Sequence, residues 1–124
     1  MASKPKLFRP GHARDRTEQN REYDARRGSA RSRGYTSAWD KAARAYLAAH
    51  PLCAYCGLVD QVAAAECVDH LYPQRVYPET FWRSEWWVPS CHACHNGYKQ
   101  GVERKGLAAL DALAVRLGRP VRPR

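Results

Sequence analysis

Two stretches of the chain carry apolar side chains at helical spacing. The first predicts a helix over residues 38–49, with Ser37 as its N-cap and Pro51 as a stop signal. Its apolar stripe, which we expect to pack against the rest of the domain, consists of Trp39, Ala42, Ala43, Tyr46 and Leu47. The second stretch predicts a packing helix over residues 107–117 that ends at Gly118.

The segment between these helices carries short apolar runs that are typical of strands. Residues 65–69 predict one strand, and residues 86–88 predict a second that Pro89 closes. A further helix should begin within residues 91–94 and run through Lys99, although two glycines weaken it. The pattern therefore predicts an α+β fold in which two short antiparallel strands are flanked by helices.

The N-terminal part of the chain lacks such a pattern. After Leu7 and Phe8, residues 1–34 are mostly polar and basic and include three glycines, so they predict a flexible basic arm. A merely solubilising arm is the alternative. We expect the folded domain to cover residues 35–118 and a basic tail to follow over residues 119–124.

The charge of the chain indicates a class of partner. The 124 residues include 21 Lys and Arg against 12 Asp and Glu, which gives a net charge of +9. An excess of this size favours a polyphosphate partner, with DNA first, although a solvated basic surface is the alternative. No segment carries a regular row of base-reading side chains, so we expect phosphate contacts and weak sequence specificity.

Four of the five cysteines form two Cys-x-x-Cys pairs, and these pairs predict a metal site. Cys53 and Cys56 precede Cys91 and Cys94 by 34 intervening residues. Four thiolates in two short loops suit the tetrahedral coordination of a structural zinc ion, and a thiol redox site is the alternative. We expect Gly57 to supply a positive φ in the first loop.

The fifth cysteine, Cys67, lies outside the two pairs. Cys67 is interpreted as a small buried residue on a strand, and a ligand or a reactive thiol is the alternative.

No stretch approaches the roughly 18 apolar residues of a membrane span, and the N-terminus lacks an apolar signal segment. We therefore expect a cytoplasmic protein with no membrane partner, whose thiols stay reduced and free to bind metal.

A second group of metal-ligating residues lies between and beside the cysteine pairs. Asp69 and His70 end a predicted strand, where neighbouring side chains point to opposite faces and can take different roles. His95 follows Cys94 directly and is the natural partner of Asp69. A carboxylate and an imidazole suit a harder divalent ion than a set of thiolates does.

Together these motifs resemble the HNH, or His-Me finger, endonuclease family, in particular small phage-type members with two zinc-binding pairs. The resemblance covers roughly residues 26–100. It rests on Leu52-Cys53-x-x-Cys56-Gly57, on Val68-Asp69-His70-Leu71-x-Pro73, on Phe81-Trp82 with Trp87, on Cys91-x-x-Cys94-His95-Asn96 with Lys99, and on a lead-in of Arg27-Gly28-Ser29, Tyr35, Trp39 and Pro51. Trp86 departs from the family, because it stands where the phage-type pattern places an Asn that braces the loop.

The resemblance implies a fold and a division of labour. The fold would be a small ββα-metal core with flanking helices. Asp69 and His95 would bind the catalytic divalent ion, Mg²⁺, Mn²⁺ or Ni²⁺, and His70 would be the general base. The reaction would be hydrolysis or nicking of double-stranded DNA, giving a 5′-phosphate and a 3′-hydroxyl.

The resemblance and the charge also imply partners. DNA contacts are expected from Arg26, Arg27, Arg31, Arg33 and Lys99. The phage-type resemblance suggests a role in genome packaging beside a terminase, in the cytoplasm of a bacterial host. We expect the protein to be a monomer. The alternative is a non-catalytic zinc module that binds DNA or a terminase and has no use for the Asp-His pair.

Overall fold

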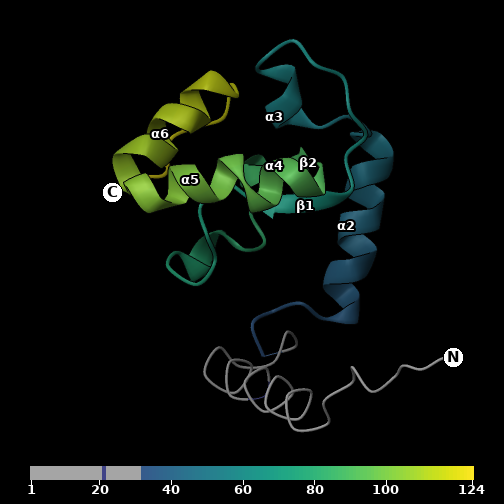
Figure 1. Ribbon diagram of the computed structural model, residues 1–124. Coiled ribbons are helices and arrows are strands. Elements are labelled where there is room, and N and C mark those ends of the chain that lie inside the picture. The colour runs from purple at the N-terminus through teal and green to yellow at the C-terminus, as the bar shows by residue number, and fades with distance from the viewer. Residues whose placement is uncertain (1–20, 22–31) are drawn as a thin grey trace, which may run out of the picture. The chain divides into compact units, whose positions relative to one another are not determined.

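The computed structural model describes Arg21 and residues 32–124 (Figure 1). The chain divides into two units, Met1–Thr36 and Ser37–Arg124. Most of the predicted arm lies outside the described residues, including Arg26, Arg27 and Arg31. Arg33 is described, and its guanidinium lies 5.7 Å from the centre of the Tyr35 ring.

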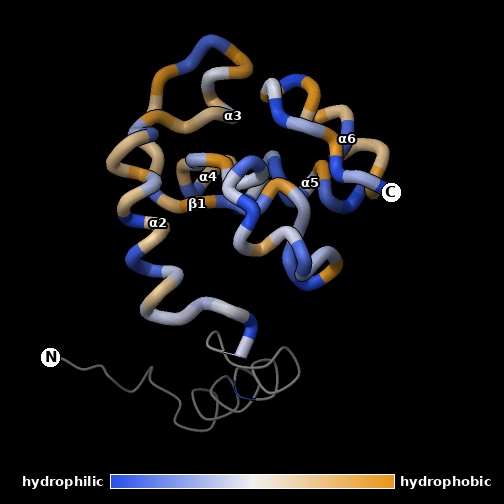
Figure 2. Tube along the Cα trace, turned by 180° about the vertical axis from the view of Figure 1, so that it is seen from behind, coloured by the Kyte–Doolittle hydropathy of each residue, from blue (hydrophilic) through white to orange (hydrophobic). Residues whose placement is uncertain are grey.

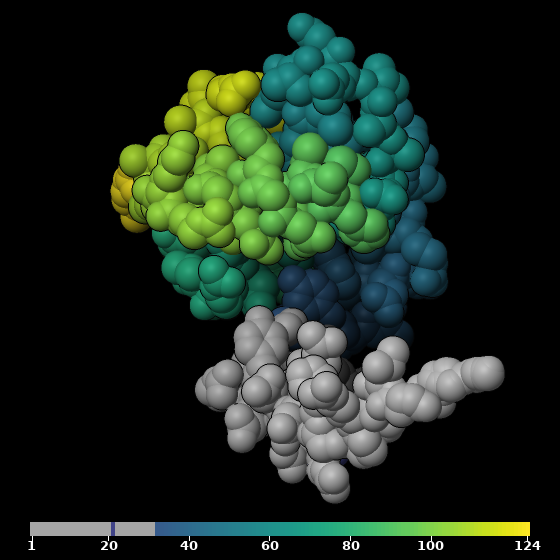
Figure 3. Space-filling model, in the orientation of Figure 1, coloured from purple at the N-terminus to yellow at the C-terminus, as the bar shows by residue number. Residues whose placement is uncertain are grey.

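The second unit combines helices with a two-stranded antiparallel sheet, as the sequence predicts. In chain order its elements are α2 (Ser37–Ala49), α3 (Ala54–Gly57), β1 (Cys67–His70), the short 3-10 helices η2 (Pro78–Thr80) and η3 (Ser84–Trp86), β2 (Trp87–Ser90), α4 (His92–Asn96), α5 (Tyr98–Lys105) and α6 (Leu107–Arg116). Figure 1 shows α4 and α5 running in front of the two strands, and Figure 3 shows them as a green band across one face of this unit.

The two strands pair so that Asp69 lies opposite Val88 and His70 opposite Trp87. The prediction that Pro89 closes the second strand is wrong, because β2 continues to Ser90. Each strand of a two-stranded sheet has one side without a neighbour, where a proline without an N–H group is tolerated. The sheet therefore ends at the residue before Cys91, and it leads the chain directly into α4.

The helices follow the predicted positions with one break. The first helix is confirmed as α2, and Trp39 is its buried residue. The helix expected to begin within residues 91–94 and to run through Lys99 is two helices, because Gly97 adopts φ −113° and ψ −80° between α4 and α5. This bend sets the direction of α5, and with it the position of Lys99.

A continuous hydrophobic core joins the strands, α3 and α6. The apolar positions of α6 that form part of it are visible as orange segments in Figure 2. Its buried members are Cys53, Tyr55, Leu71, Tyr72, Trp86, Val88, Cys91, Leu110, Leu113 and Ala114. Two cysteines of the predicted zinc site therefore belong to the core itself.

The last residues of the chain, predicted as a basic tail, belong to the same unit and contact its other residues. The indole N–H of Trp86 donates to the carbonyl of Pro120 at 2.7 Å. The backbone N–H of Arg122 donates to the Tyr72 hydroxyl at 3.1 Å, and Arg124 pairs with Asp111 at 2.9 Å. Polar contacts to buried groups thus hold a basic segment that has no apolar pattern of its own.

Among the described residues, no helix is both long enough and apolar enough to cross a membrane.

The buried Tyr72 hydroxyl gives a stability prediction. It donates to Asp111 at 2.6 Å, and burial together with this carboxylate raises the pKa of Tyr72 to about 12. Replacing Tyr72 by Phe should lower the free energy of unfolding by about 1 kcal/mol, because a buried hydrogen bond is lost. Urea unfolding measures the difference.

Tyr98→Phe is the matched control, because the Tyr98 hydroxyl contacts only Arg116 among the described hydrogen bonds and its side chain is exposed. This variant should change the stability by less than about 0.5 kcal/mol. Equal losses in the two variants would contradict the role given to the Tyr72 hydroxyl.

Candidate functional site

The sulfur atoms of the four paired cysteines converge. All four Sγ atoms lie within 4.8 Å of one another, and no other such cluster of three or more potential ligands occurs in the described part of the chain. The Sγ of Cys56 lies 3.9 Å from that of Cys91 and 3.7 Å from that of Cys94. Tetrahedral zinc with Zn–S bonds of about 2.3 Å requires sulfur separations of about 3.8 Å. The cluster could therefore hold a zinc ion.

Two short helices present these sulfurs. Cys53 caps the N-terminus of α3, where its Sγ accepts the N–H of Cys56 at 3.4 Å. Cys91 is the N-cap residue of α4, and Cys94 lies within that helix. The expected positive φ is not at Gly57, which belongs to α3, but at Asp60, with φ 59°.

The thiols are too close to carry four negative charges without a cation. Burial opposes ionisation of Cys53, but hydrogen bonds from the Cys56 and Cys91 backbones lower the pKa of its thiol to about 7. Burial and the neighbouring thiols raise the pKa of Cys94 far above its usual value. A bound divalent cation would remove this conflict, because it deprotonates the thiols that coordinate it.

Cys67 lies on β1, outside the cluster. Its Sγ is 3.5 Å from the carbonyl of Ser90, and burial raises the pKa of its thiol to about 11. Cys67 lies on a strand as the sequence predicts, but it is partly and not fully buried.

Beside the cluster, Asp69 and His95 lie close together. The Asp69 side chain is 4% exposed, and its Oδ1 lies 3.4 Å from Nε2 of His95, whose side chain is 40% exposed. Its other oxygen, Oδ2, accepts the Tyr55 hydroxyl at 2.6 Å and lies 3.1 Å from Nζ of Lys99. The two carboxylate oxygens therefore have different surroundings.

Lys99 is a component of this site and not a surface residue. Its side chain has no exposed area, and Nζ donates to the carbonyl of His70 at 2.9 Å and to Glu103 at 2.7 Å. The predicted phosphate contact of Lys99 does not agree with this arrangement, because three protein oxygens surround the ammonium group. A buried lysine needs such partners to remain charged.

The His70 imidazole lies in an aromatic environment. Its ring stacks on Trp39 with a centroid distance of 4.7 Å, and the Phe81 ring is 4.4 Å away. Nε2 lies 3.0 Å from the carbonyl oxygen of Phe81. A carbonyl can only accept, so Nε2 carries a proton and the lone pair of the neutral ring is on Nδ1.

The surroundings of His70 favour its neutral form. Burial lowers the pKa of His70 below its usual value, although the hydrogen bond to Phe81 and the charge of Asp69 act in the opposite direction. The charges of Lys99 and His95 lower the pKa further. An imidazole that is neutral near pH 7 can accept a proton.

The loop between β1 and β2 is closed by its backbone. The N–H of Leu71 donates to the carbonyl of Trp86 at 2.9 Å, while the Trp86 side chain is buried in the core. The Trp86 side chain therefore serves packing, and a main-chain hydrogen bond spans the base of the loop.

Sequence reasoning missed three groups in this site. The Phe81 carbonyl has no residue-type signal, because every residue carries one. Glu103 lies one helical turn after Lys99, a spacing that could have indicated the pair. Tyr55 lies between Cys53 and Cys56, two of the predicted zinc ligands, and this position could have indicated its role.

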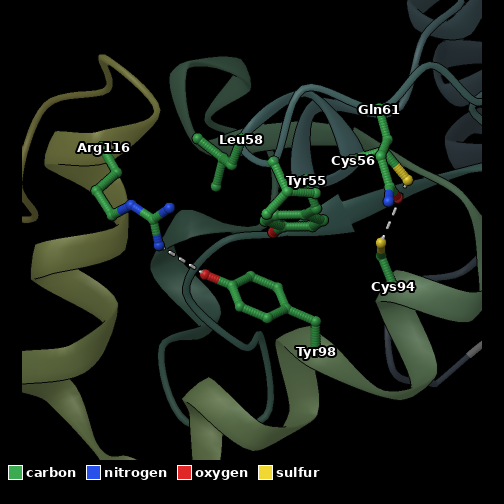
Figure 4. Close-up of a pocket in the computed structure, with 8 residues that line it drawn as sticks. Tyr55, Cys56, Leu58, Gln61, Cys94, Tyr98 and Arg116 are labelled. Atoms are coloured by element: carbon green, nitrogen blue, oxygen red, sulfur yellow. Dashed lines mark hydrogen bonds between the residues drawn. The ribbon is translucent and has the colours of Figure 1, made fainter.

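A small pocket of about 200 Å³ borders the cysteine cluster (Figure 4). It is lined by Tyr55, Cys56, Leu58, Val59, Gln61, Cys94, Tyr98 and Arg116. One guanidinium N–H of Arg116 donates to the hydroxyl of Tyr98 at 3.1 Å across it. The ring of Tyr55 thus faces this pocket, while its hydroxyl binds Asp69.

Comparisons with protein-family models, with curated proteins and with solved structures gave no match for this chain.

The geometry of the sulfurs predicts the effect of removing one of them. Purified protein should contain about one zinc ion per chain, and Cys56→Ala should lose this ion and unfold, because small domains with structural zinc depend on it. Metal analysis by mass spectrometry and near-ultraviolet circular dichroism measure the two effects.

Cys67→Ala is the control, since it removes a thiol outside the cluster. It should keep the zinc ion and the fold. Full zinc content in the Cys56→Ala protein would show that this sulfur is not a ligand.

Proposed function

We propose that this protein is a metal-dependent DNA endonuclease of the HNH type. The observation that carries the proposal is the adjacency of two different groups at the end of β1. Asp69 faces His95, and the next residue, His70, is a buried imidazole whose surroundings favour the neutral form. A hydrolytic site needs these two functions, an ion ligand and a proton acceptor, side by side.

The Asp69 and His95 atoms fit a shared divalent ion. Bonds of about 2.1 Å from one ion can reach both Oδ1 and Nε2, which lie 3.4 Å apart. Mg²⁺ usually keeps several waters beside one or two protein ligands and binds phosphate oxygens. A carboxylate and an imidazole also accept Mn²⁺ or Ni²⁺.

The surrounding elements support the proposed ββα-metal core. The chain order is β1, β2 and then α4. Strand β1 carries Asp69 and His70, and helix α4 carries His95. Zinc in the cysteine cluster would join α3 to the start of α4. Such a staple suits a unit with only two strands of four residues, which burial alone stabilises poorly.

The proposed reaction assigns a proton transfer to His70. Nδ1 takes a proton from water, the oxygen attacks phosphorus, and the bond from phosphorus to the 3′ oxygen breaks. The leaving 3′ oxygen takes a proton from solvent water, and His70 releases its proton to solvent. A divalent ion at Asp69 and His95 supplies charge stabilisation at the phosphate and the leaving oxygen when it is bound. The products are a 5′-phosphate and a 3′-hydroxyl. The Phe81 carbonyl holds the imidazole in the tautomer that this transfer needs.

The substrate we propose is double-stranded DNA with weak sequence specificity. The net charge of +9 favours a phosphate backbone, and Arg33 and the basic residues before it are the proposed contacts. A role in phage genome packaging beside a terminase, in a bacterial host cytoplasm, is part of this proposal.

One observation favours the second candidate function, a non-catalytic zinc module. Both oxygens of Asp69 have protein partners, as they would in a purely structural carboxylate. This candidate binds DNA or a protein partner and predicts no phosphodiester cleavage.

Plasmid cleavage separates the two functions. With zinc bound to the four cysteines, the wild-type protein should nick supercoiled plasmid in Mg²⁺ or Mn²⁺. The nicking should stop when EDTA is added. His70→Ala should lower the rate by at least about 100-fold, because general bases contribute factors of that size. Agarose gels resolve the supercoiled, nicked and linear forms.

His50→Ala is the matched control, because His50 is an exposed imidazole whose ring lies at a tilt against that of Tyr46. It should cleave at the wild-type rate. Undiminished cleavage by His70→Ala would remove His70 as the base, and no cleavage by the wild-type protein in Mg²⁺, Mn²⁺ or Ni²⁺ would favour the non-catalytic module.

A further inference from the structure

We propose that Tyr55 is a positioning residue, which holds Asp69 in the orientation that binds the divalent ion. Through Tyr55, this orientation depends on zinc bound to the four-cysteine cluster. The inference rests on the proposed function, since it concerns the ion that Asp69 and His95 would share.

The contact between Tyr55 and Asp69 is short and buried. The Tyr55 hydroxyl donates to Oδ2 of Asp69 at 2.6 Å, and the two residues are each 3% exposed. Figure 4 shows the Tyr55 ring above Tyr98 of α5, and the two ring centres are 5.7 Å apart. Packing therefore fixes the ring, and the ring fixes the hydroxyl.

This contact distinguishes the two oxygens of the carboxylate. Rotation about the last side-chain bond would exchange Oδ1 and Oδ2. Two donors, the Tyr55 hydroxyl and the Lys99 ammonium, lie at Oδ2, while Oδ1 lies beside His95. With both donors on one side, the other oxygen stays directed at the imidazole.

Lys99 alone would define this orientation poorly. Its ammonium group is shared among Asp69, Glu103 and the His70 carbonyl, and the shortest of these contacts is the one to Glu103. A flexible point charge with three acceptors sets the distance of the carboxylate more than its rotation. The hydroxyl of Tyr55, which is carried by a rigid ring, determines the rotation of the Asp69 carboxylate.

The position of Tyr55 in the sequence connects this contact to zinc. Tyr55 lies in α3 between Cys53 and Cys56, and both cysteines contribute sulfurs to the cluster. His95, on the other side of the ion, follows Cys94. The residues that orient and complete the divalent-ion site are thus direct neighbours of zinc ligands on both loops.

Tyr55→Phe tests the inference, because it removes the hydroxyl and keeps the ring. Titration of zinc-loaded protein with Mn²⁺, followed by the electron paramagnetic resonance of the free ion, should show affinity about tenfold weaker than wild type, as is usual when a group that orients a metal ligand is lost. In plasmid nicking, the Mn²⁺ concentration for half-maximal rate should rise by the same factor, and the rate at saturating Mn²⁺ should be retained.

Tyr98→Phe is the matched control, since its hydroxyl lies in the same pocket but contacts Arg116. It should bind Mn²⁺ as the wild-type protein does. Both variants should keep their zinc, measured by mass spectrometry.

The outcomes separate this inference from the proposed function. Wild-type affinity or tighter binding of Mn²⁺ in Tyr55→Phe would overturn the positioning role and leave the endonuclease proposal in place. Loss of zinc from Tyr55→Phe would also overturn it, because the hydroxyl would then support the cage and not the carboxylate. A wild-type protein that binds no Mn²⁺ would overturn both proposals.

Discussion

The convergence of four cysteine sulfurs is the constraint on which the rest of this structure depends. Two strands of four residues and several short helices bury too little surface to define a site with sub-ångström accuracy. Two of the converging sulfurs come from the start of α3 and two from the start of α4, and two of the four cysteines are part of the hydrophobic core. A zinc ion that coordinates all four would therefore stabilise the core and fix the relative positions of the elements that carry the proposed catalytic groups.

Buried polar contacts extend from this constraint to Asp69. Tyr55, between two cysteines, and Lys99, on α5, both bind one oxygen of the carboxylate. Glu103 balances the charge of Lys99. The side chains around Asp69 thus include two carboxylates and one ammonium group, beside the imidazole of His95. Such networks are stable only when each member has its partners, which is why α3, β1 and α5 must keep their relative positions.

Aromatic packing determines the position of His70, the proposed base. Trp39 reaches His70 from α2, and Phe81 reaches it from the loop between the strands. The indole N–H of Trp87 also donates to the Phe81 carbonyl, at 2.9 Å, so this one oxygen is held by two donors. The imidazole is thereby oriented by the loop backbone, which does not require a particular side chain at position 86.

The parts of this structure that the sequence predicted are those with local or spaced signals. Apolar periodicity located the first helix, and the Cys-x-x-Cys spacing identified the four sulfurs that converge. The break at Gly97 and the strand through Pro89 depend on backbone geometry and on sheet edges, which residue types do not specify. Lys99 was interpreted as a phosphate ligand because the HNH resemblance places a lysine near this position, and only the fold shows that its side chain is enclosed.

Anomalous diffraction from crystals of the zinc-loaded protein soaked in Mn²⁺ tests most directly whether a zinc cage holds a separate divalent-ion site. We expect a zinc peak among the four cysteine sulfurs and a manganese peak between Oδ1 of Asp69 and Nε2 of His95. A zinc peak alone, with the Asp69 carboxylate still bound to Tyr55 and Lys99 and no manganese beside it, would contradict the two-site arrangement and identify the protein as a zinc module without a hydrolytic site.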